Sequence, residues 1–165
     1  MKNFIYATLA FLLISCSITK PETKQSKKTL KGTWEVVNIR FVSDKGMNKA
    51  SLFDLVDVNC FKGSEWVFIP ENGRGKFTIL NSGQCENSIN RIHWSLHEPG
   101  DGTFQFQFKY VDTKNNPINN ENRGYRSKIE QFDTNSMIMR IATTFEGNSF
   151  EIAMTFNKTS EEINL

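Results

Sequence analysis

The sequence predicts an all-β domain in which eight antiparallel strands close into an up-and-down β-barrel. The clearest strand is Thr103 to Val111, where Phe104, Phe106, Phe108 and Tyr110 alternate with polar residues. This period of two places all four rings on one face of a pleated strand, whereas a helix would spread them around its circumference. One strand cannot bury four rings, so the rest of the chain must supply a sheet that curves over them.

Seven further segments have the composition and length of short strands, and tight turns such as Asn72-Gly73 separate them. They are Gly32 to Val42, Ser64 to Ile69, Lys76 to Leu80, Ser88 to Leu96, Tyr125 to Phe132, Ser136 to Thr144 and Ser149 to Asn157. Short strands at regular spacing favour an antiparallel meander, and closing eight of them into a barrel removes both exposed edges. A sandwich of two sheets is the alternative.

One short helix is expected between the first two strands, over Asn48 to Asn59. Leu52, Leu55 and Val56 recur there at helical spacing, with polar residues on the other side. Such a helix would either act as a lid over the mouth of the barrel or simply cover an open end.

The N-terminus has the pattern of an export signal. Lys2 precedes an apolar run from Phe4 to Ile14, which is too short to span a bilayer and ends in Leu13-Ile14-Ser15-Cys16. This pattern resembles the signal peptide (residues 1–15) and lipobox of a bacterial lipoprotein, which implies that Cys16 is lipidated and becomes the first mature residue. An ordinary signal peptide and an uncleaved anchor are the alternatives.

Residues 16–29 are expected to tether the domain to a membrane. Ser17 to Thr29 is polar and rich in lysine, which is typical of a flexible linker. Ser17, by resemblance to sorting in Gram-negative lipoproteins, favours the outer membrane of the cell envelope. The net charge is +2, or +1 without Lys2, so no nucleic-acid partner is implied, and we expect a monomer.

Cys60 and Cys85 remain once Cys16 is assigned to lipid. In an oxidising compartment two such thiols are expected to pair, and the alternative is a pair of free buried thiols. The chain contains no Cys-x-x-Cys motif that would favour a redox or metal role.

No catalytic residue, metal ligand set or cofactor site is predicted. His93 and His97 are the only histidines, and on one strand they would lie about 13 Å apart, too far to share a metal. No nucleophile lies in a recognised motif. An enzyme is the weakest of three functional hypotheses, and its ionisable candidates are limited to Glu65, Arg91, His93, Arg126 and Arg140.

The apolar faces of the strands are the candidate ligand site. Nine inward-facing residues are predicted to line the interior: Trp66, Phe68, Phe77, Trp94, Phe104, Phe106, Phe108, Tyr110 and Met154. They either fill the barrel with their own side chains or line a cavity for an apolar ligand, and periodicity does not distinguish the two.

Nearly the whole mature chain resembles the small lipocalin-like lipoproteins of Bacteroidetes. Besides the lipobox, the resemblance lies in Gly32-Thr33-Trp34, Cys60-Phe61-Lys62-Gly63-Ser64-Glu65-Trp66, Ile92-His93-Trp94-Ser95 and Gly124-Tyr125-Arg126. It implies a compact lipocalin-like barrel over residues 30–160, with Trp34 closing its floor. Lipocalins place an Arg on the closing strand across that Trp. Here that strand offers only Lys158, so Arg140, one strand earlier, is the expected substitute.

Two functions follow from these expectations. The first is a membrane-anchored, lipocalin-like lipoprotein that binds a small hydrophobic or amphiphilic ligand in its barrel. The alternative is a structural or interaction module of the cell envelope, with a filled barrel and no small-molecule ligand.

Overall fold

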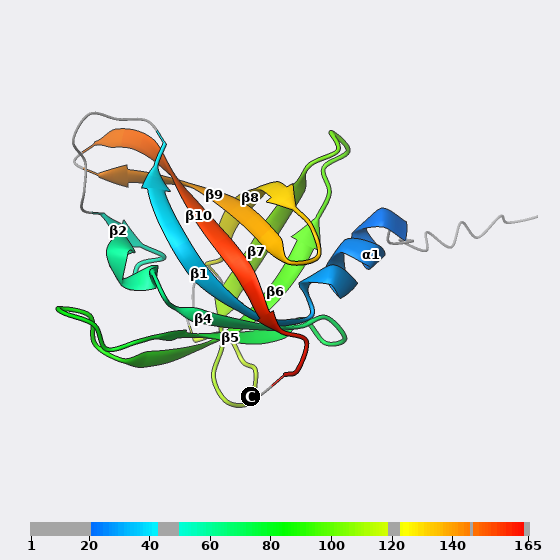
Figure 1. Ribbon diagram of the computed structural model, residues 1–165, viewed down its shortest axis with the longest axis horizontal. Helices are drawn as coiled ribbons and strands as arrows, with labels where there is room; N and C mark the ends of the chain where they lie inside the picture. The colour runs from blue at the N-terminus through cyan, green and yellow to red at the C-terminus, as the bar shows by residue number, and fades with distance from the viewer. Residues whose placement is uncertain (1–20, 43–49, 119–122, 146, 164–165) are drawn as a thin grey trace, which may run out of the picture.

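The computed structural model describes residues 21–42, 50–118, 123–145 and 147–163, and its strands form a closed barrel (Figure 1). The order around the barrel is β1-β10-β9-β8-β7-β6-β5-β4, and every neighbouring pair is antiparallel. The barrel strands are β1 (Gly32–Phe41), β4 (Glu65–Ile69), β5 (Arg74–Ile79), β6 (Ser88–His97), β7 (Phe104–Tyr110), β8 (Tyr125–Phe132), β9 (Ser136–Phe145) and β10 (Asn148–Ser160). The predicted fold class is confirmed, and the sandwich is excluded.

Strand β1 closes the barrel because it pairs with β10 on one side and β4 on the other. Trp34 lies opposite Lys158 of β10 and Trp66 of β4. Two register shifts in β1 against β10 mark bulges, which increase local bending and twist. One end of the barrel, called the floor below, holds Trp34. The other, called the open end, is crossed by residues 50–61.

A short helix does lie between the first two barrel strands, but it is the 3-10 helix η1 (Val58–Phe61) and not a helix over Asn48 to Asn59. Most of the predicted span forms a small hairpin, β2 (Ser51–Leu52) with β3 (Val56–Asp57). Phe53 and Asp54 at its tip have φ values of 56° and 52°, in the left-handed region that a right-handed helix excludes. Asn48 and Lys49 lie outside the described residues.

A helix, α1 (Pro21–Leu30), occupies most of the segment expected to be a flexible tether. Two barrel side chains bind its final carbonyls: Trp34 Nε1 donates to Leu30 O at 2.9 Å, and Lys158 Nζ donates to Thr29 O at 2.8 Å. Donors and cations at a helix C-terminus satisfy its free carbonyls and its negative dipole end. The flexible-tether prediction is therefore wrong for residues 21–29, while Cys16 and residues 17–20 lie outside the described residues.

The partner of Trp34 at the floor is Lys158 and not Arg140. The Lys158 ammonium lies 5.1 Å from the centre of the fully buried Trp34 ring and also binds Glu161. Arg140 points to the outer surface, because its neighbours Met139 and Ile141 point inward and side chains alternate along a strand. The prediction for Arg140 is therefore wrong, and its guanidinium instead forms outer ion pairs with Glu130 (2.7 Å) and Glu151 (3.1 Å).

Gly32 lets the chain enter the barrel at the floor. Its φ is +116°, and a Cβ placed on it would collide with the carbonyl oxygen of Ser160. Only glycine fits this close approach, which accounts for the glycine two positions before Trp34. In the part of the chain that the structure describes, no helix has the length and apolar character required to span a bilayer.

The predicted disulfide between Cys60 and Cys85 is present. It joins η1 to the loop between β5 and β6, which carries an isolated bridge from Ser82 to Cys85. The segment that crosses the open end is therefore covalently attached to the rim of the barrel.

Replacing both cysteines, Cys60→Ser with Cys85→Ser, is expected to lower the free energy of unfolding by roughly 3 kcal/mol, because the bridge closes a loop with a sequence separation of 25. Urea unfolding of the double variant measures the loss. Unfolding of the reduced wild-type chain is the control and should show a similar loss. An unchanged urea midpoint in both would contradict this prediction.

Candidate functional site

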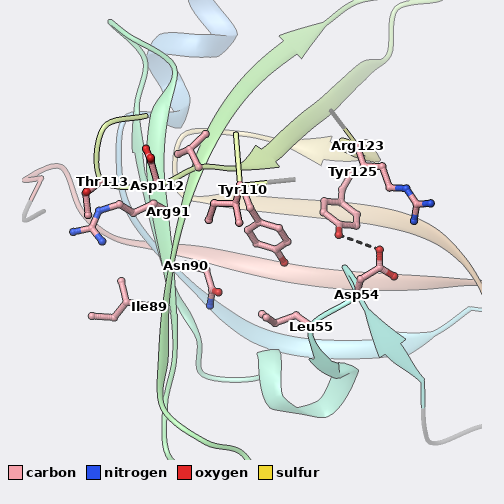
Figure 2. Close-up of a pocket in the computed structure, with 12 residues that line it drawn as sticks. Asp54, Leu55, Ile89, Asn90, Arg91, Tyr110, Asp112, Thr113, Arg123 and Tyr125 are labelled. Atoms are coloured by element: carbon pink, nitrogen blue, oxygen red, sulfur yellow. Dashed lines mark hydrogen bonds between the residues drawn. The ribbon is translucent and has the colours of Figure 1, made fainter. Parts of the chain in front are cut away.

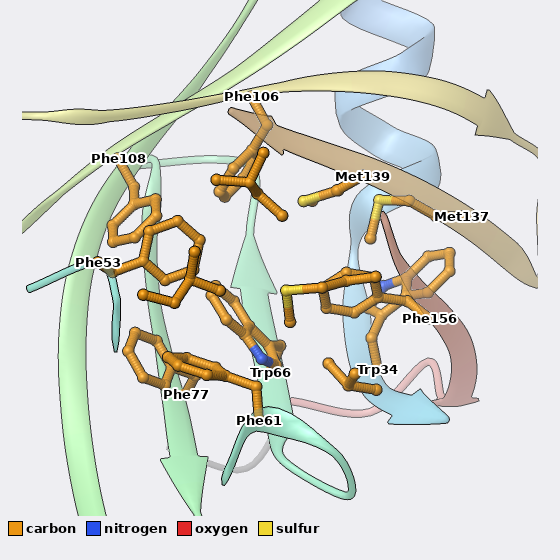
Figure 3. Packing of buried hydrophobic residues seen from close by; sticks show 14 of the residues in the cluster. Trp34, Phe53, Phe61, Trp66, Phe77, Phe106, Phe108, Met137, Met139 and Phe156 are labelled. Atoms are coloured by element: carbon orange, nitrogen blue, oxygen red, sulfur yellow. The ribbon is translucent and has the colours of Figure 1, made fainter. Parts of the chain in front are cut away.

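The barrel interior is filled by its own side chains. Trp66 stacks on Phe77 with ring centres 4.4 Å apart (Figure 3). Phe68 meets Phe106 edge-on at 5.4 Å. Trp66, Phe68, Phe77, Trp94, Phe106, Phe108 and Met154 are all buried in one hydrophobic cluster, against which Phe104 and Tyr110 pack from its edge. The nine residues predicted to line the interior therefore pack largely against one another, and a ligand would have to displace rings to enter.

Phe53, at the tip of the β2–β3 hairpin, closes the open end. Its ring lies 4.9 Å from that of Phe108, 5.5 Å from Phe61 and 5.5 Å from Tyr125, each in an edge-on contact. Its side chain is inserted among the core rings (Figure 3), and the residue is only 8% exposed. The segment between β1 and β4 thus plugs the barrel mouth with one aromatic ring.

Two tyrosines hold this plug in place. The Tyr110 hydroxyl donates to the carbonyl oxygen of Phe53 at 3.1 Å, and the Tyr125 hydroxyl donates to Asp54 Oδ2 at 3.1 Å (Figure 2). A left-handed backbone at two consecutive non-glycine residues is costly and persists only where surrounding contacts enforce it. The tyrosines of β7 and β8 supply those contacts.

A pocket of about 780 Å³ lies beside the plug, on the rim of the open end (Figure 2). The β2–β3 tip, the start of β6, the end of β7 with its following loop, and the start of β8 enclose it. Its lining is Asp54, Leu55, Ile89, Asn90, Arg91, Tyr110, Val111, Asp112, Thr113, Ile118, Arg123 and Tyr125. Tyr110 is the predicted interior residue that lines it.

Exposed apolar side chains mark this pocket. In the described part of the chain, three large apolar residues are exposed: Leu80 at 51%, Ile89 at 61% and Ile118 at 60%. Ile89 and Ile118 both line the pocket, where they join the half-buried Leu55. Clustered exposed apolar surface is unfavourable in water and is characteristic of binding sites.

Two acidic and two basic side chains line the pocket. Tyr125 occupies one oxygen of Asp54, and Asp112 accepts hydrogen bonds from Lys114 N and Asn116 N, both at 2.8 Å. Arg91 and Arg123 contribute guanidinium groups on either side of the pocket (Figure 2). Guanidinium groups bind carboxylates and phosphates through charge-assisted hydrogen bonds.

Burial keeps both tyrosines protonated. It raises the pKa of Tyr125 to about 12, and the hydrogen bond to Asp54 and the charge of that carboxylate contribute to the increase. Burial likewise raises the pKa of Tyr110 above its ordinary value, with the charges of Tyr125 and Asp54 acting in the same direction. Both hydroxyls are therefore hydrogen-bond donors at neutral pH.

The ionisable residues considered for an enzyme are not gathered in one site. Arg91 lines the rim pocket, whereas Arg140 is held in outer ion pairs and Glu65 lies opposite Glu35 on the β1–β4 side of the barrel. His93 is on the outer face of β6, opposite Arg74. Within the described ranges, no three His, Cys, Asp or Glu side chains lie close enough together to hold a metal ion.

Sequence patterns indicated some of the rim residues and not others. Ile89 is an apolar residue out of phase with Ile92 and Trp94 on its strand, so its outward position carried a usable signal. Phe53 carried none, because a bulky aromatic residue is rarely left-handed and no sequence pattern predicts it there.

No protein-family model and no curated protein sequence matches this chain. Among solved structures, it is similar to bovine odorant-binding protein in complex with a selenium-containing odorant, with 17% identity and a TM-score of 0.42 over 88% of this chain and 80% of that one. Bovine odorant-binding protein with its natural ligand gives 17% identity and a TM-score of 0.40 over 82% and 74%.

A pH titration should detect the hydrogen bond from Tyr125 to Asp54. In a chain starting at Ser17, Tyr110 and Tyr125 are the two tyrosines, and their tyrosinate absorbance should emerge only well above the ordinary tyrosine pKa of about 10. Because the folded pKa is raised, the stabilisation is complete below about pH 10 and is lost as the pH rises toward 12.

Asp54→Asn should lower the pKa of the first tyrosine transition toward 10. The substitution removes a negative charge and leaves an amide oxygen that still accepts the hydrogen bond from Tyr125. Tyr125→Phe identifies which transition belongs to Tyr125. Ionisation of the folded wild type near pH 10 would contradict both the burial of Tyr125 and its hydrogen bond to Asp54.

Proposed function

We propose that this protein is a membrane-anchored lipoprotein that binds a small amphiphilic molecule in the rim pocket of its lipocalin-like barrel. The observation that carries the proposal is the gathering of exposed Ile89 and Ile118 beside Arg91 and Arg123 in a pocket of about 780 Å³. Apolar side chains next to cationic donors fit a molecule with a hydrocarbon tail and an anionic head, such as a fatty acid or lipid fragment.

The packed interior supports placing the ligand at the rim. Tyr110 and Tyr125 hold the Phe53 plug over a core that is already filled. A tail could lie along Leu55, Ile89 and Ile118 without disturbing that core, whereas a deeper position would require the strained hairpin tip to move. The rim pocket therefore allows binding at a lower cost than the interior does.

The same packed interior supports one alternative function. A barrel whose core cluster includes fully buried Trp66, Phe68 and Phe77 is stable without a ligand. In that case the protein would be a structural or interaction module of the cell envelope, and the rim pocket would take no small molecule.

Isothermal titration calorimetry of the chain starting at Ser17 separates the two functions. Decanoate and the uncharged decanol should both bind, and Arg91→Gln with Arg123→Gln should weaken decanoate binding about tenfold, the loss of one effective charge-assisted hydrogen bond. Decanol binding should remain unchanged, because the alcohol carries no anionic head.

Two further variants test the assignment of this site. Ile89→Ser should weaken the binding of both compounds, while Arg40→Gln with Arg126→Gln removes two exposed arginines outside the pocket and should affect neither. Absence of binding to the wild-type chain would favour the structural module. Equal losses of decanoate affinity in the two double arginine variants would indicate that decanoate is attracted by the overall charge and not by this pocket.

The attachment to a membrane through Cys16 is a separate part of the proposal, and the support for it is the lipobox resemblance of Leu13 to Cys16. Expression of the full-length chain in a bacterium, followed by mass spectrometry of the N-terminal peptide, should find a mature chain that begins at acylated Cys16. Cys16→Ser should abolish acylation, and Cys85→Ser should not. An unmodified N-terminus at another residue would contradict the anchor.

A further inference from the structure

The outer faces of three neighbouring strands, β5, β6 and β7, carry one sign of charge, and β8 adds two cations beside Glu130, which pairs with Arg140. Because side chains alternate, the strands that bury aromatic rings direct basic residues outward. Strands β5, β6 and β7 contain no aspartate or glutamate. The cations on the outer faces of β5 to β8, called the basic wall below, are Arg74, Lys76, Arg91, Lys109, Arg126 and Lys128.

These charges are arranged unfavourably for the fold itself. Lys76 lies directly opposite Arg91, and Arg74 and Lys109 lie on either side of His93 in one row. Like charges opposite each other across strands lower stability. Since the whole chain carries a net charge of only +2, this concentration on one wall is not explained by stability and indicates an anionic partner.

The basic wall is hollowed between its rows. A second pocket, of about 290 Å³, lies among Arg74, Lys76 and Arg91 and is closed on one side by residues 111–115. Asp112 at its edge is engaged by the backbone of its own loop. Three basic side chains around a hollow of this size suit a phosphate group, which binds through several charge-assisted hydrogen bonds.

Helix α1 lies next to the basic wall. The helix contacts β6, and Trp34 and Lys158 fix its C-terminal carbonyls. Burial is the main cause that lowers the pKa of His93, and the positive charges of Lys109 and Arg74 lower it further. Lys27 of α1 adds to the same effect, so the helix and the wall share one positive field.

We propose that the basic wall is a docking surface for a membrane rich in anionic phospholipids, whose phosphate groups enter the hollow between Arg74 and Arg91. The inference rests on the proposed lipid anchor for its orientation. Cys16 precedes Pro21 by five residues, which span at most about 18 Å, so the N-terminal end of α1 lies within that distance of the anchor. The rim pocket shares Arg91 and residues 111–113 with the hollow, and an amphiphile can therefore pass directly from the bilayer into it.

Vesicle co-sedimentation of the chain starting at Ser17 tests the wall without the anchor. A chain that starts at Ser17 keeps every residue that the structure describes, since these lie within 21–163. Binding is expected to vesicles of phosphatidylglycerol with phosphatidylcholine, and not to phosphatidylcholine alone. Arg74→Gln with Lys76→Gln should weaken it about 30-fold, since each basic residue near an anionic surface contributes roughly fivefold. Neither residue lines the rim pocket.

Arg40→Gln with Lys62→Gln is the matched control: it removes the same charge from exposed positions outside the wall and should leave binding almost unchanged. Raising the salt concentration to 0.5 M should weaken the wild-type interaction, because the charges are exposed. Equal binding to both vesicle types would overturn the proposal, as would equal losses in the two variants. Wall-dependent binding to a soluble polyanion without vesicle binding would also overturn it.

Because this chain carries no lipid and the wall variant keeps Arg91 and Arg123, each outcome is specific to the docking surface. Failure of vesicle binding alongside intact decanoate binding and acylation of Cys16 would reject only the docking surface. Loss of decanoate binding or of acylation alone would instead reject the corresponding part of the proposed function.

Discussion

The packing of aromatic rings across the barrel is the constraint on which the rest of the structure depends. Trp66 lies at its centre and contacts rings from η1, from β5, β7 and β10, and from the hairpin that crosses the open end. These contacts hold the two sides of the barrel together and leave the interior filled. The proposed binding site therefore lies at the rim, where apolar surface is still exposed.

The hairpin tip at the rim has a strained backbone that neighbouring side chains hold in place. Phe53 completes the aromatic core, yet its backbone and that of Asp54 are left-handed and require Tyr110 and Tyr125 as partners. Those tyrosines also line the rim pocket. A ligand in the pocket would therefore contact the groups that keep the mouth closed, which gives this site a direct physical connection to the barrel interior.

The N-terminal helix links the floor of the barrel to its outer surface. Trp34 and Lys158 bind the last carbonyls of α1, so a helical arm held at its C-terminal end takes the place of the expected flexible linker. This arm lies beside β6, one strand of the basic wall, and the rim pocket shares Arg91 with the hollow of that wall. Alternation along β5 to β8 produces the aromatic interior and the basic exterior together.

The sequence by itself determined most of the strands, because alternation and tight turns are local features of a pleated strand. It favoured barrel closure and the pairing of Cys60 with Cys85, which the structure confirms. Tertiary structure alone decided the hairpin at Phe53, the choice of Lys158 over Arg140 at the floor, and the helical state of residues 21–30. It also decided that the predicted interior residues pack against one another and that the pocket lies at the rim. Each of these depends on contacts between residues distant in the chain, whose energies exceed the local preferences that a sequence pattern records.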